Sequence, residues 1–393
     1  MNKKSIKVYI DITCLLRVNY VTGIQRVVRE VVLQMLSHQR LKLVLLKACG
    51  GIGQYTRVDN DAFVCRYAGN GDSSVDPDTG KRVRLERMTP EDVFFDLDSV
   101  WNLSVKRNVL YPLLKERGVK LAVYIYDIIP VTHPQYCHEE TVLNFMGYIG
   151  AALQYADLLI ASAQSTLDSI ARLERKLGLQ EVPGCVSWLG CDKKAVKGSA
   201  PVIDHRAVRA VSSGPYILTV GTIEPRKNHK VLLDAFDKGL FGDDLRLVFV
   251  GRIGWNVKEL EKRIRQHPEF GRRLFLLEGM NDDSVDYLYR HALFVAFPTF
   301  EEGFGLPMIE AFERKAPVIA SDIRVLREVG EDFALYFPPE DADAFIRIVR
   351  SYRNDPDAWR RLKSHLDDYE PYTWDQTARN IEDALLTVQA DLE

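Results

Sequence analysis

The sequence predicts an α/β protein of two domains, each built on a parallel sheet that helices cover on both faces. Short apolar segments alternate with amphipathic ones along most of the chain. The strand candidates are almost continuously apolar, which is typical of strands buried on both sides. The length of 393 residues exceeds what one hydrophobic core ordinarily organises, so two domains are expected.

The first half of the chain predicts strands and helices in alternation. Residues 6–13 form a predicted buried strand, and apolar residues at helical spacing predict a helix over 22–38. Further strands are predicted at LKLVLLKA, DVFFDL, KLAVYIYDI and 156–163, and further helices over 141–156 and 163–179. The segment 50–90 is rich in Gly, Asp and Arg and has no clear period, so a loop or irregular excursion is expected there.

A polar segment broken by Pro and Gly, 192–214, is predicted to link the domains. The domains are therefore assigned to residues 1–195 and 196–372. The last segment, 372–388, is predicted to be an amphipathic helix that Thr373 caps, with Trp374 at its start.

The second half repeats the alternation more clearly. Strands are predicted at 215–222, 245–251, 273–279, 293–299 and 317–322, and helices at 228–240, 257–267, 282–292 and 305–315. Ligands of such sheets bind beyond the carboxyl ends of the strands. Small residues, cations and acids converge there: Gly221, Thr222, Arg226 and Lys227 after the first strand, Arg252 after the second, Gly279 and Met280 after the third, and residues 301–305 after the fourth.

The overall composition narrows the function classes. A net charge of −3 argues against a dedicated nucleic-acid binder, because affinity for a phosphate backbone comes from clustered Lys and Arg. The six cysteines include no CxxC pair, so reduced thiols in a cytosolic protein are expected. The amino-terminal segment lacks a long apolar core, so no secretory signal is expected, and no stretch approaches the roughly 18 apolar residues of a membrane-spanning helix.

The converging residues predict a site for a nucleotide sugar. Arg226 and Lys227 suit phosphate oxygens, and a helix that opens after glycines offers unpaired N–H donors. The carboxylates of Glu302 and Glu310 can then accept hydrogen bonds from ribose or hexose hydroxyls. Each signal alone has a simpler interpretation. An Arg-Lys pair is usually a solvated surface, helix-start glutamates are usually exposed, and Glu310 could be buried with a partner or face solvent.

Four stretches carry a family resemblance. The stretch from Glu302 to Glu310 resembles the EX7E motif of retaining GT-B glycosyltransferases of family 4, and 220–229 (VGTIEPRKNH) is similar to the donor-phosphate loop of its mannosyltransferase-like members. Residues 22–27 and 126–136 resemble amino-terminal segments of its bacterial surface-polysaccharide enzymes. The resemblance implies the GT-B fold, two Rossmann-like domains with a cleft between them, and a terminal helix, 373–393, that packs back on the first domain.

The resemblance also implies roles for the carboxyl-terminal residues. Glu302 would contact the donor sugar and Glu310 the ribose, while Arg226 and Lys227 would bind the diphosphate and stabilise the leaving group. The remaining donor contacts would come from Thr222, Arg252, Gly279, Met280, Phe304, Gly305 and Leu306, with the amides of the last three on sugar and phosphate oxygens and the main chain of Gly279 and Met280 on the base. Thr222 stands where relatives often have a cation, so the phosphate would depend more on Arg226 and Lys227.

Two residues of the first domain belong to the implied site. Gly23 would bring its backbone near the diphosphate, although an ordinary turn glycine is the simpler interpretation. Asp127 would lie near the transferred sugar or the acceptor. Many relatives carry His before this Asp, whereas this chain has Tyr126, and His133 is an alternative for the missing sugar contact.

The implied activity is retaining transfer of a hexose, with mannose and GDP-mannose favoured, to a glycan or lipid-linked glycan in O-antigen, capsule or lipopolysaccharide synthesis. A front-side transfer is expected, because Glu310 is assigned to the ribose and leaves no second carboxylate for a nucleophile–acid pair. No cofactor is expected. No metal is expected either, because no Asp-x-Asp motif is placed at a strand end, the nearest being DLD at 96–98. The location would be cytoplasmic, with peripheral contact at the inner face of the plasma membrane through the basic segment 105–120, for which a solvated surface is the simpler interpretation.

Two other functions remain open at this point. A nucleotide-sugar 2-epimerase or a glycoside phosphorylase would use the same scaffold without a glycan acceptor. A non-catalytic protein that binds nucleotides or glycans would retain binding and show no transfer.

Overall fold

The computed structural model describes residues 6–17, 23–69, 71–191, 201–212, 214–239 and 244–390. The chain divides into two compact units, one of residues Met1–Val196 with Tyr372–Glu393 and the other of Lys197–Pro371. The divisions predicted from the sequence fall after residues 195 and 372. The last segment of the chain therefore belongs to the same unit as the first.

Unit 1 is built on an eight-stranded sheet in the order β4-β3-β2-β1-β5-β6-β7-β8. The strands are β1 (Lys7–Asp11), β2 (Lys42–Ala48), β3 (Gln54–Val58), β4 (Asp78–Arg84), β5 (Asp92–Asp96), β6 (Lys120–Ile125), β7 (Leu158–Ala161) and β8 (Gly184–Val186). The helices are α1 (Thr13–Arg17), α2 (Gly23–His38), α3 (Asn60–Tyr67), α4 (Arg107–Lys115), α5 (Ile129–Thr132), α6 (Glu139–Tyr155), α7 (Gln164–Leu177) and α16 (Trp374–Ala390). The order of strands reverses between β1 and β5, the topological switch point of this sheet.

The segment 50–90 differs from the prediction, which was wrong to leave it irregular. It holds β3, α3 and β4, and both strands join the sheet antiparallel. The strands escaped notice because β4 is an edge strand with the sequence DTGKRVR, whose side chains are mostly exposed or half-buried. A strand with so little buried surface does not carry the apolar pattern that marks the central strands.

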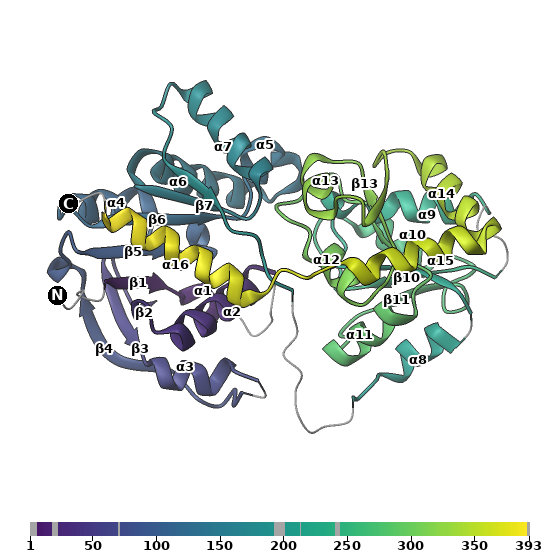
Figure 1. The fold of residues 1–393 in the computed structure, drawn as a ribbon, viewed down its shortest axis with the longest axis horizontal. Coiled ribbons are helices and arrows are strands. Elements are labelled where there is room, and N and C mark those ends of the chain that lie inside the picture. The colour runs from purple at the N-terminus through teal and green to yellow at the C-terminus, as the bar shows by residue number, and fades with distance from the viewer. Residues whose placement is uncertain are drawn as a thin grey trace. The chain divides into compact units, whose positions relative to one another are not determined.

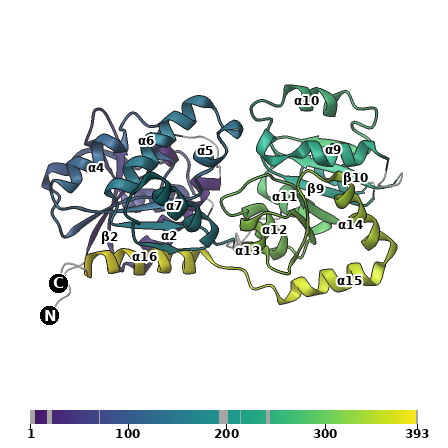
Figure 2. The same cartoon turned by 90° about the horizontal axis from the view of Figure 1, so that it is seen from above.

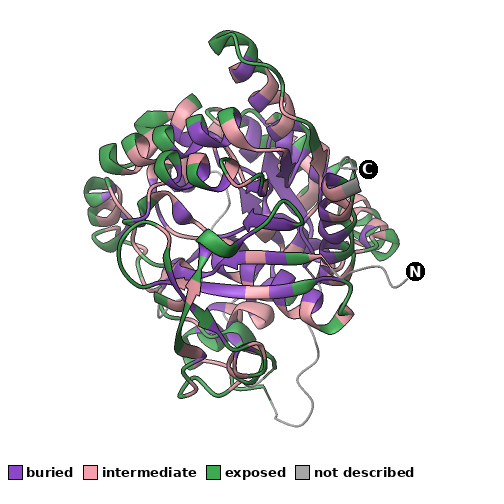
Figure 3. Cartoon of the chain, turned by 90° about the vertical axis from the view of Figure 1, so that its left-hand side faces the viewer, coloured by how far each residue is buried: buried purple, intermediate pink, exposed green. Residues whose placement is uncertain are grey.

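The core of unit 1 lies along its strands, where buried residues dominate (Figure 3). Helices α4 and α6 pack together over one part of this core. Helix α16, drawn in yellow in Figure 1, packs on α2 and β6, although it comes from the far end of the sequence.

The amino terminus of α16 has the predicted cap. The Thr373 hydroxyl accepts from the Gln376 amide at 3.2 Å, and the Gln376 side chain accepts from the Thr373 amide at 2.8 Å. This reciprocal pair is a capping box, which satisfies two donors that the helix leaves free. Trp374 follows with only 2% of its surface exposed, so the first turn is anchored in unit 1.

Unit 2 is built on a six-stranded parallel sheet in the order β11-β10-β9-β12-β13-β14. Helices α9 and α10 cover one face, and α11, α12 and α13 cover the other (Figure 2). The strands are β9 (Tyr216–Val220), β10 (Arg246–Val250), β11 (Leu274–Leu277), β12 (Phe294–Phe297), β13 (Val318–Ser321) and β14 (Ala334–Phe337). The helices are α8 (His205–Ser212), α9 (His229–Asp237), α10 (Lys258–Arg265), α11 (Asp282–His291), α12 (Leu306–Glu313), α13 (Arg324–Gly330), α14 (Ala342–Asn354) and α15 (Pro356–His365).

The predicted linker 192–214 needs correction. Helix α8 occupies part of it and packs on α11, with Ala207 and Ala210 fully buried, so this part belongs to unit 2. Residues 192–200 and 213 of the predicted linker lie outside the described residues.

Candidate active site

The candidate site lies at the topological switch point of unit 2, between β9 and β12. These strands are neighbours in the sheet, but the chain reaches β10 from β9 and β13 from β12, in opposite directions. The loops that follow the two strands therefore diverge and leave room at the carboxyl edge, where α/β sheets bind ligands. The first loop carries Arg226 and Lys227, and the second carries Glu302.

The loop after β9 is held by a short 3₁₀ turn, Pro225–Lys227, and by Asn228. Asn228 has a φ of 51°, a left-handed conformation that asparagine tolerates better than most residues. Its side-chain amide donates to the carbonyl oxygens of Pro298 and Pro339, at 3.0 and 2.6 Å. The turn is thus tied to the ends of two other strands, which fixes the direction of the two cations before it.

The structure brings Arg226, Lys227 and Glu302 into direct contact. Arg226 Nη1 lies 3.0 Å from Glu302 Oε2, and Lys227 Nζ donates to Glu302 Oε1. Arg226 also donates to the main-chain oxygen of Glu301 at 2.6 Å. The side chains are 18%, 15% and 9% exposed, in the order named, so the cluster is screened from water but still reachable.

A second carboxylate, that of Glu224, binds the cluster through Arg226. It is 5% exposed and accepts from Arg226 Nη2 at 2.9 Å. The hydroxyl of the buried Thr299 lies between the two loops. It is within donating distance of the carbonyl oxygens of Arg226, at 3.1 Å, and Glu301, at 2.9 Å. Two cations and two carboxylates therefore face one another in a compact group whose formal charges cancel.

Burial and charge compete for the protonation of this group. Burial alone would raise the pKa of Glu302, but Arg226 and Lys227 outweigh it and hold that pKa below its ordinary value. Burial raises the pKa of Glu224, although the same two cations oppose the shift. Burial, with Lys227 adding to it, lowers the pKa of the neighbouring His229 to about 3, so this imidazole is neutral near neutral pH and adds no third cation.

The entrance to α12 provides the glycine-lined helix start. Gly305 has a φ of 104°, and a β-carbon there would lie 2.8 Å from Leu326, so a larger residue would be both strained and crowded. Phe304 is buried, while Leu306, the first residue of α12, is half-buried. The first amides of α12 thus open onto the same sheet edge as Glu302.

Glu310 lies on α12, separated from Glu302 by the glycine turn and about one turn of helix. Its carboxylate Oε2 lies 3.3 Å from the hydroxyl of Tyr289, which also lies 3.4 Å from the Pro307 oxygen. Glu310 is half-buried, so it is neither a core residue nor a freely solvated one.

The other predicted donor residues of unit 2 stand at neighbouring strand ends. Thr222 follows β9, the exposed Arg252 follows β10, and Gly279 and Met280 follow β11. The loops after β9 and β10 touch each other, because a β-carbon on Gly251 would lie 2.0 Å from the Gly221 oxygen. The sheet order places β11 outside β10, two strands from β9, so Gly279 and Met280 stand farther along the edge than Arg226.

Gly23 and Asp127 belong to unit 1, where they remain predictions about the site. Gly23 is exposed at the start of α2. Asp127 is half-buried and accepts from the amide of Ile129, the first residue of the short α5, at 2.9 Å. The Tyr126 hydroxyl donates to the Leu97 oxygen at 2.7 Å, and His133 is half-buried and contacts Thr132.

Sequence reasoning placed Asn228 and Glu224 at this edge but missed the structural role of Asn228, the buried role of Glu224 and Thr299 altogether. The first could have been found, because Asn directly before a helix is a common left-handed or capping residue. The premise about DLD was also wrong, since Asp96 is the last residue of β5 and therefore stands at a strand end. Among the described residues, no group of three His, Cys, Asp or Glu side chains could hold a metal ion. Independence from metals stays a prediction.

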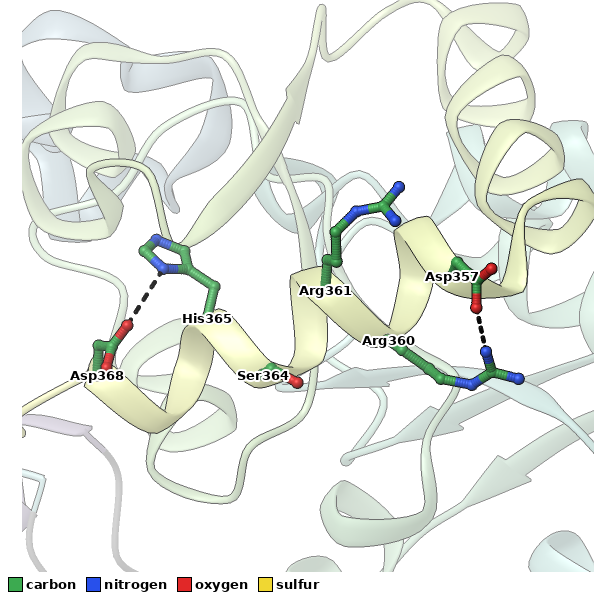
Figure 4. Close-up of a pocket in the computed structure, with 6 residues that line it drawn as sticks. All are labelled: Asp357, Arg360, Arg361, Ser364, His365 and Asp368. Carbon is green, nitrogen blue, oxygen red and sulfur yellow. Dashed lines mark hydrogen bonds and ion pairs between the residues drawn. The ribbon is translucent and has the colours of Figure 1, made fainter.

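A solvent-open hollow runs along α15 and is lined by Asp357, Arg360, Arg361, Ser364, His365 and Asp368 (Figure 4). Its charged side chains already have partners: Arg360 pairs with Asp357, and His365 lies 3.8 Å from Asp368 and 3.3 Å from Asp332, which precedes β14. None of the residues of the switch point lines it. We therefore assign the site to the switch point and not to this hollow.

Comparison with known families identifies the domain that holds the cluster. Residues 203–366, which include the whole cluster, match the family described as glycosyl transferases group 1. The chain contains a glycosyltransferase group 1 domain. The motif that first suggested the family, from Glu302 to Glu310, lies inside the matched region.

Related proteins extend the likeness beyond this glycosyltransferase domain. The serotype-specific mannosyltransferase WbdA of Escherichia coli is 29% identical over 357 residues, which is 88% of this chain and 41% of WbdA. The O-antigen chain mannosyltransferase B of Escherichia coli is 33% identical over 259 residues, covering 65% of this chain and 66% of that protein. The chain thus spans about two fifths of the length of WbdA.

Solved structures show the fold. HepE of Anabaena, in complex with UDP and glucose, superposes with a TM-score of 0.65 over 98% of this chain and 100% of its own, at 14% identity. Sucrose-phosphate synthase of Thermosynechococcus elongatus gives a TM-score of 0.65 over 99% and 100%, at 16% identity. The predicted GT-B fold, with two Rossmann-like units, is confirmed. Within the described residues, no helix is both long enough and apolar enough to cross a bilayer.

Proposed function

We propose that the chain is a retaining glycosyltransferase that transfers a hexose, with mannose favoured, from a nucleoside diphosphate to a glycan in bacterial O-antigen synthesis. The cluster of Arg226, Lys227 and Glu302 at the switch point of a group 1 domain carries the proposal. The relatives, a serotype-specific mannosyltransferase and an O-antigen chain mannosyltransferase, support the class of product.

The two cations would bind the diphosphate. A guanidinium presents a fork that matches phosphate oxygens, and an ammonium beside it adds a compact charge. Both side chains are largely shielded from water. In such an environment, a cation stabilises a developing negative charge more strongly than it does in bulk solvent. Their present partner is Glu302, so an incoming diphosphate would compete with this carboxylate for both cations.

The carboxylates would bind the neutral parts of the donor. Glu302 would accept hydrogen bonds from sugar hydroxyls once the phosphates take over its cations. Glu310, whose carboxylate already contacts the Tyr289 hydroxyl, would hold the ribose hydroxyls. Main-chain groups near Gly279 and Met280 would meet the base, and the amides of Phe304, Gly305 and Leu306 would meet sugar and phosphate oxygens.

Transfer would then proceed on the face that the leaving group vacates. Arg226 and Lys227 would stabilise the departing diphosphate, which would accept the proton of the attacking hydroxyl. A double displacement would need a nucleophilic carboxylate, whereas Glu302 is engaged by two cations and Asp127 accepts from the Ile129 amide. Isolation of a covalent sugar adduct on Glu302 or Asp127 would refute the front-side transfer. No cofactor and no metal enter the proposal.

The acceptor would be a glycan or a lipid-linked glycan, reached from the cytoplasm. We also propose peripheral contact with the inner face of the plasma membrane through 105–120, with fewer cations available to the lipid than the sequence suggests. Arg107 of this segment is buried, and Lys115 pairs with Asp157 at 2.8 Å, so both cations are already engaged within the unit.

A panel of GDP- and UDP-sugars in a thermal unfolding assay tests the donor site. A ligand at about 100 times its Kd stabilises by roughly 2.7 kcal/mol. For a unit of this size, that amounts to a rise in Tm of about 5–10 °C. We expect GDP-mannose to give the largest shift. A panel in which no nucleotide sugar raises the Tm would refute the donor site.

Product analysis tests the reaction. Donor with a mannose-terminated acceptor should yield a glycoside with the anomeric configuration of the donor, which NMR of the product reads directly. Donor alone should yield neither an epimer nor a sugar phosphate. Formation of an epimer would favour the 2-epimerase, and binding without any product would favour a non-catalytic protein.

A further inference from the structure

The DLD sequence at 96–98 is left unused by the proposed chemistry, although both aspartates are buried. Asp96 accepts from Arg107 Nε and Nη2 at 2.6 and 2.8 Å, and from the Tyr111 hydroxyl at 2.6 Å. Arg107 also reaches Asp11 at 2.7 Å and is itself 2% exposed. Asp96 is therefore one half of an internal ion pair at the end of β5.

Asp98 is different, because no salt bridge to it forms within the described chain. Its two oxygens instead accept from main-chain amides, Oδ2 from Leu15 at 2.8 Å and Oδ1 from Ser99 at 2.7 Å. Only 2% of Asp98 is exposed. A buried carboxylate without a cation is costly, so its retention needs a reason other than stability.

The next residue, Ser99, continues the contacts to both sides. Its carbonyl accepts from the Cys14 thiol of α1 at 3.1 Å, and its hydroxyl accepts from the Gln25 side chain of α2 at 2.9 Å. Gln25 is only 4% exposed, so this contact is fixed. Asp98 and Ser99 thus contact α1 on one side and the first turn of α2 on the other, at the switch point between β1 and β5.

We propose that Asp98 is a positioning residue for the transfer reaction, which with Ser99 fixes α1 and the first turn of α2 and so sets the backbone of Gly23. Gly23 is the first residue of α2, two positions before Gln25. The inference rests on the proposed function only for the role of Gly23 toward the donor. The bracket itself, defined as the contacts of Asp98 and Ser99 with Leu15, Cys14 and Gln25, is independent of it.

The ionisation of Asp98 makes the bracket sensitive to pH. Burial raises the pKa of Asp98 to about 6, with the Leu15 and Ser99 amides opposing the shift and Asp11 adding to it. Two further titratable groups interact with it, the thiol of Cys14 on α1 and the hydroxyl of Tyr126 after β6. A protonated carboxyl carries a donor of its own, so it no longer accepts fully from both amides.

The sign of the effect on stability separates positioning from packing. Because the folded pKa is raised, ionised Asp98 costs stability above pH 6 and this cost disappears as the pH falls. Asp98→Asn removes the charge at nearly constant shape, so the free energy of unfolding should not fall. The amide group of Asn can accept from only one of the two N–H groups in the same way.

Hydrogen exchange tests the bracket without any substrate. At about pH 7.5, we expect the amides of Leu15 and Ser99 to exchange roughly tenfold faster in Asp98→Asn than in the wild type. At about pH 5.5, after correction for the intrinsic rate, the wild type should approach the variant. Asp92→Asn is the matched control, because Asp92 is also buried on β5 and accepts from the Thr89 amide at 2.9 Å, but at the other end of the strand. Equal exchange in Asp98→Asn and wild type would overturn the bracket.

The pH profile of transfer tests the positioning role. Wild-type kcat/KM should fall below about pH 6, whereas Asp98→Asn should be roughly tenfold lower at neutral pH and lack this acid limb. The Asp92→Asn control should keep the wild-type profile. An unchanged acid limb in Asp98→Asn would refute the positioning role. Failure of the wild type to transfer any sugar would refute the proposed function, and the exchange experiment would still decide the bracket.

Discussion

At the scale of single residues, the proposed donor site implies a competition for two cations. Glu302 holds Arg226 and Lys227, and the proposed donor would need the same pair for its phosphates. The partners of the cluster come from two loops that are about 75 positions apart in sequence, as the Lys227–Glu302 contact shows. The balance between the carboxylate and the phosphates should therefore be measurable by changing one side chain at a time.

Lys227→Ala should weaken every nucleotide sugar by a similar factor. The loss of one charge–phosphate contact in a shielded site corresponds to about 2 kcal/mol, or roughly 30-fold in Kd. Isothermal titration with the donor panel measures the effect. Lys230→Ala is the matched control, since Lys230 is exposed and pairs with Asp234 on the surface of α9. An affinity within twofold of the wild type would reject the phosphate role of Lys227.

Glu302→Gln should separate binding from transfer. Without the carboxylate, the two cations lose a competitor, and free nucleoside diphosphate should bind about tenfold tighter, a gain of ~1.4 kcal/mol. Transfer should nevertheless fall by about 100-fold or more, because the sugar loses its acceptor. Glu301→Gln provides the control, since Arg226 contacts the main-chain oxygen of Glu301. Weaker diphosphate binding in Glu302→Gln would show that the carboxylate does not compete.

At the scale of elements, α16 is tied to α2 by a buried imidazole. His38, at the end of α2, lies 2.8 Å from Asp375 through Nε2 and 2.9 Å from Glu382 through Nδ1. The Glu382 side chain is fully buried, and Arg40 reaches it at only 3.4 Å.

His38→Ala should loosen α16. The change leaves Glu382 buried without its nearest partner, which costs about 3 kcal/mol. Urea unfolding followed by the fluorescence of Trp374, in a variant that lacks the other tryptophans, measures the loss. His138→Ala, at an exposed position of the same unit, should leave the midpoint unchanged. Equal midpoints for the two variants would show that the His38 contacts do not hold the helix.

The elements also show what the sequence could and could not predict. Strands β9 to β13 were predictable because each is buried on both faces and hence continuously apolar. The strands of 50–90 were not, because one apolar face among charged residues resembles a loop. The meeting of Arg226, Lys227 and Glu302 followed from the rule that parallel strands share a carboxyl edge. The partners Glu224, Asn228 and Thr299 depend on the exact path of the loops, which no local pattern encodes.

At the scale of the whole molecule, unit 1 is discontinuous in sequence. It consists of the first 196 residues and the last 22, from Tyr372 onward. Helix α16 buries Trp374, Ala378, Ile381 and Leu385 almost completely. Unit 2, in contrast, is one continuous segment that contains the whole switch-point cluster.

Truncation after Pro371 should therefore affect the two units differently. Loss of the buried Trp, Ile and Leu side chains removes about 6 kcal/mol of apolar burial from unit 1. Calorimetry of the full chain should show two transitions, and that of the truncated chain should retain the one that nucleoside diphosphate shifts. Survival of both transitions at their original temperatures would show that α16 is dispensable for unit 1.

The exposed strand at one end of the unit 1 sheet has a consequence for the behaviour of the protein in solution. Lys81, Arg82 and Arg84 project from β4, while the opposite border, β8, is only three residues long. The unpaired backbone groups of an edge strand can pair with a strand of another chain. Like charges on the strand, as on β4, and a short strand, as in β8, disfavour such pairing. The positive charges that made β4 hard to predict from the sequence thus disfavour aggregation through this edge of the sheet at high protein concentration.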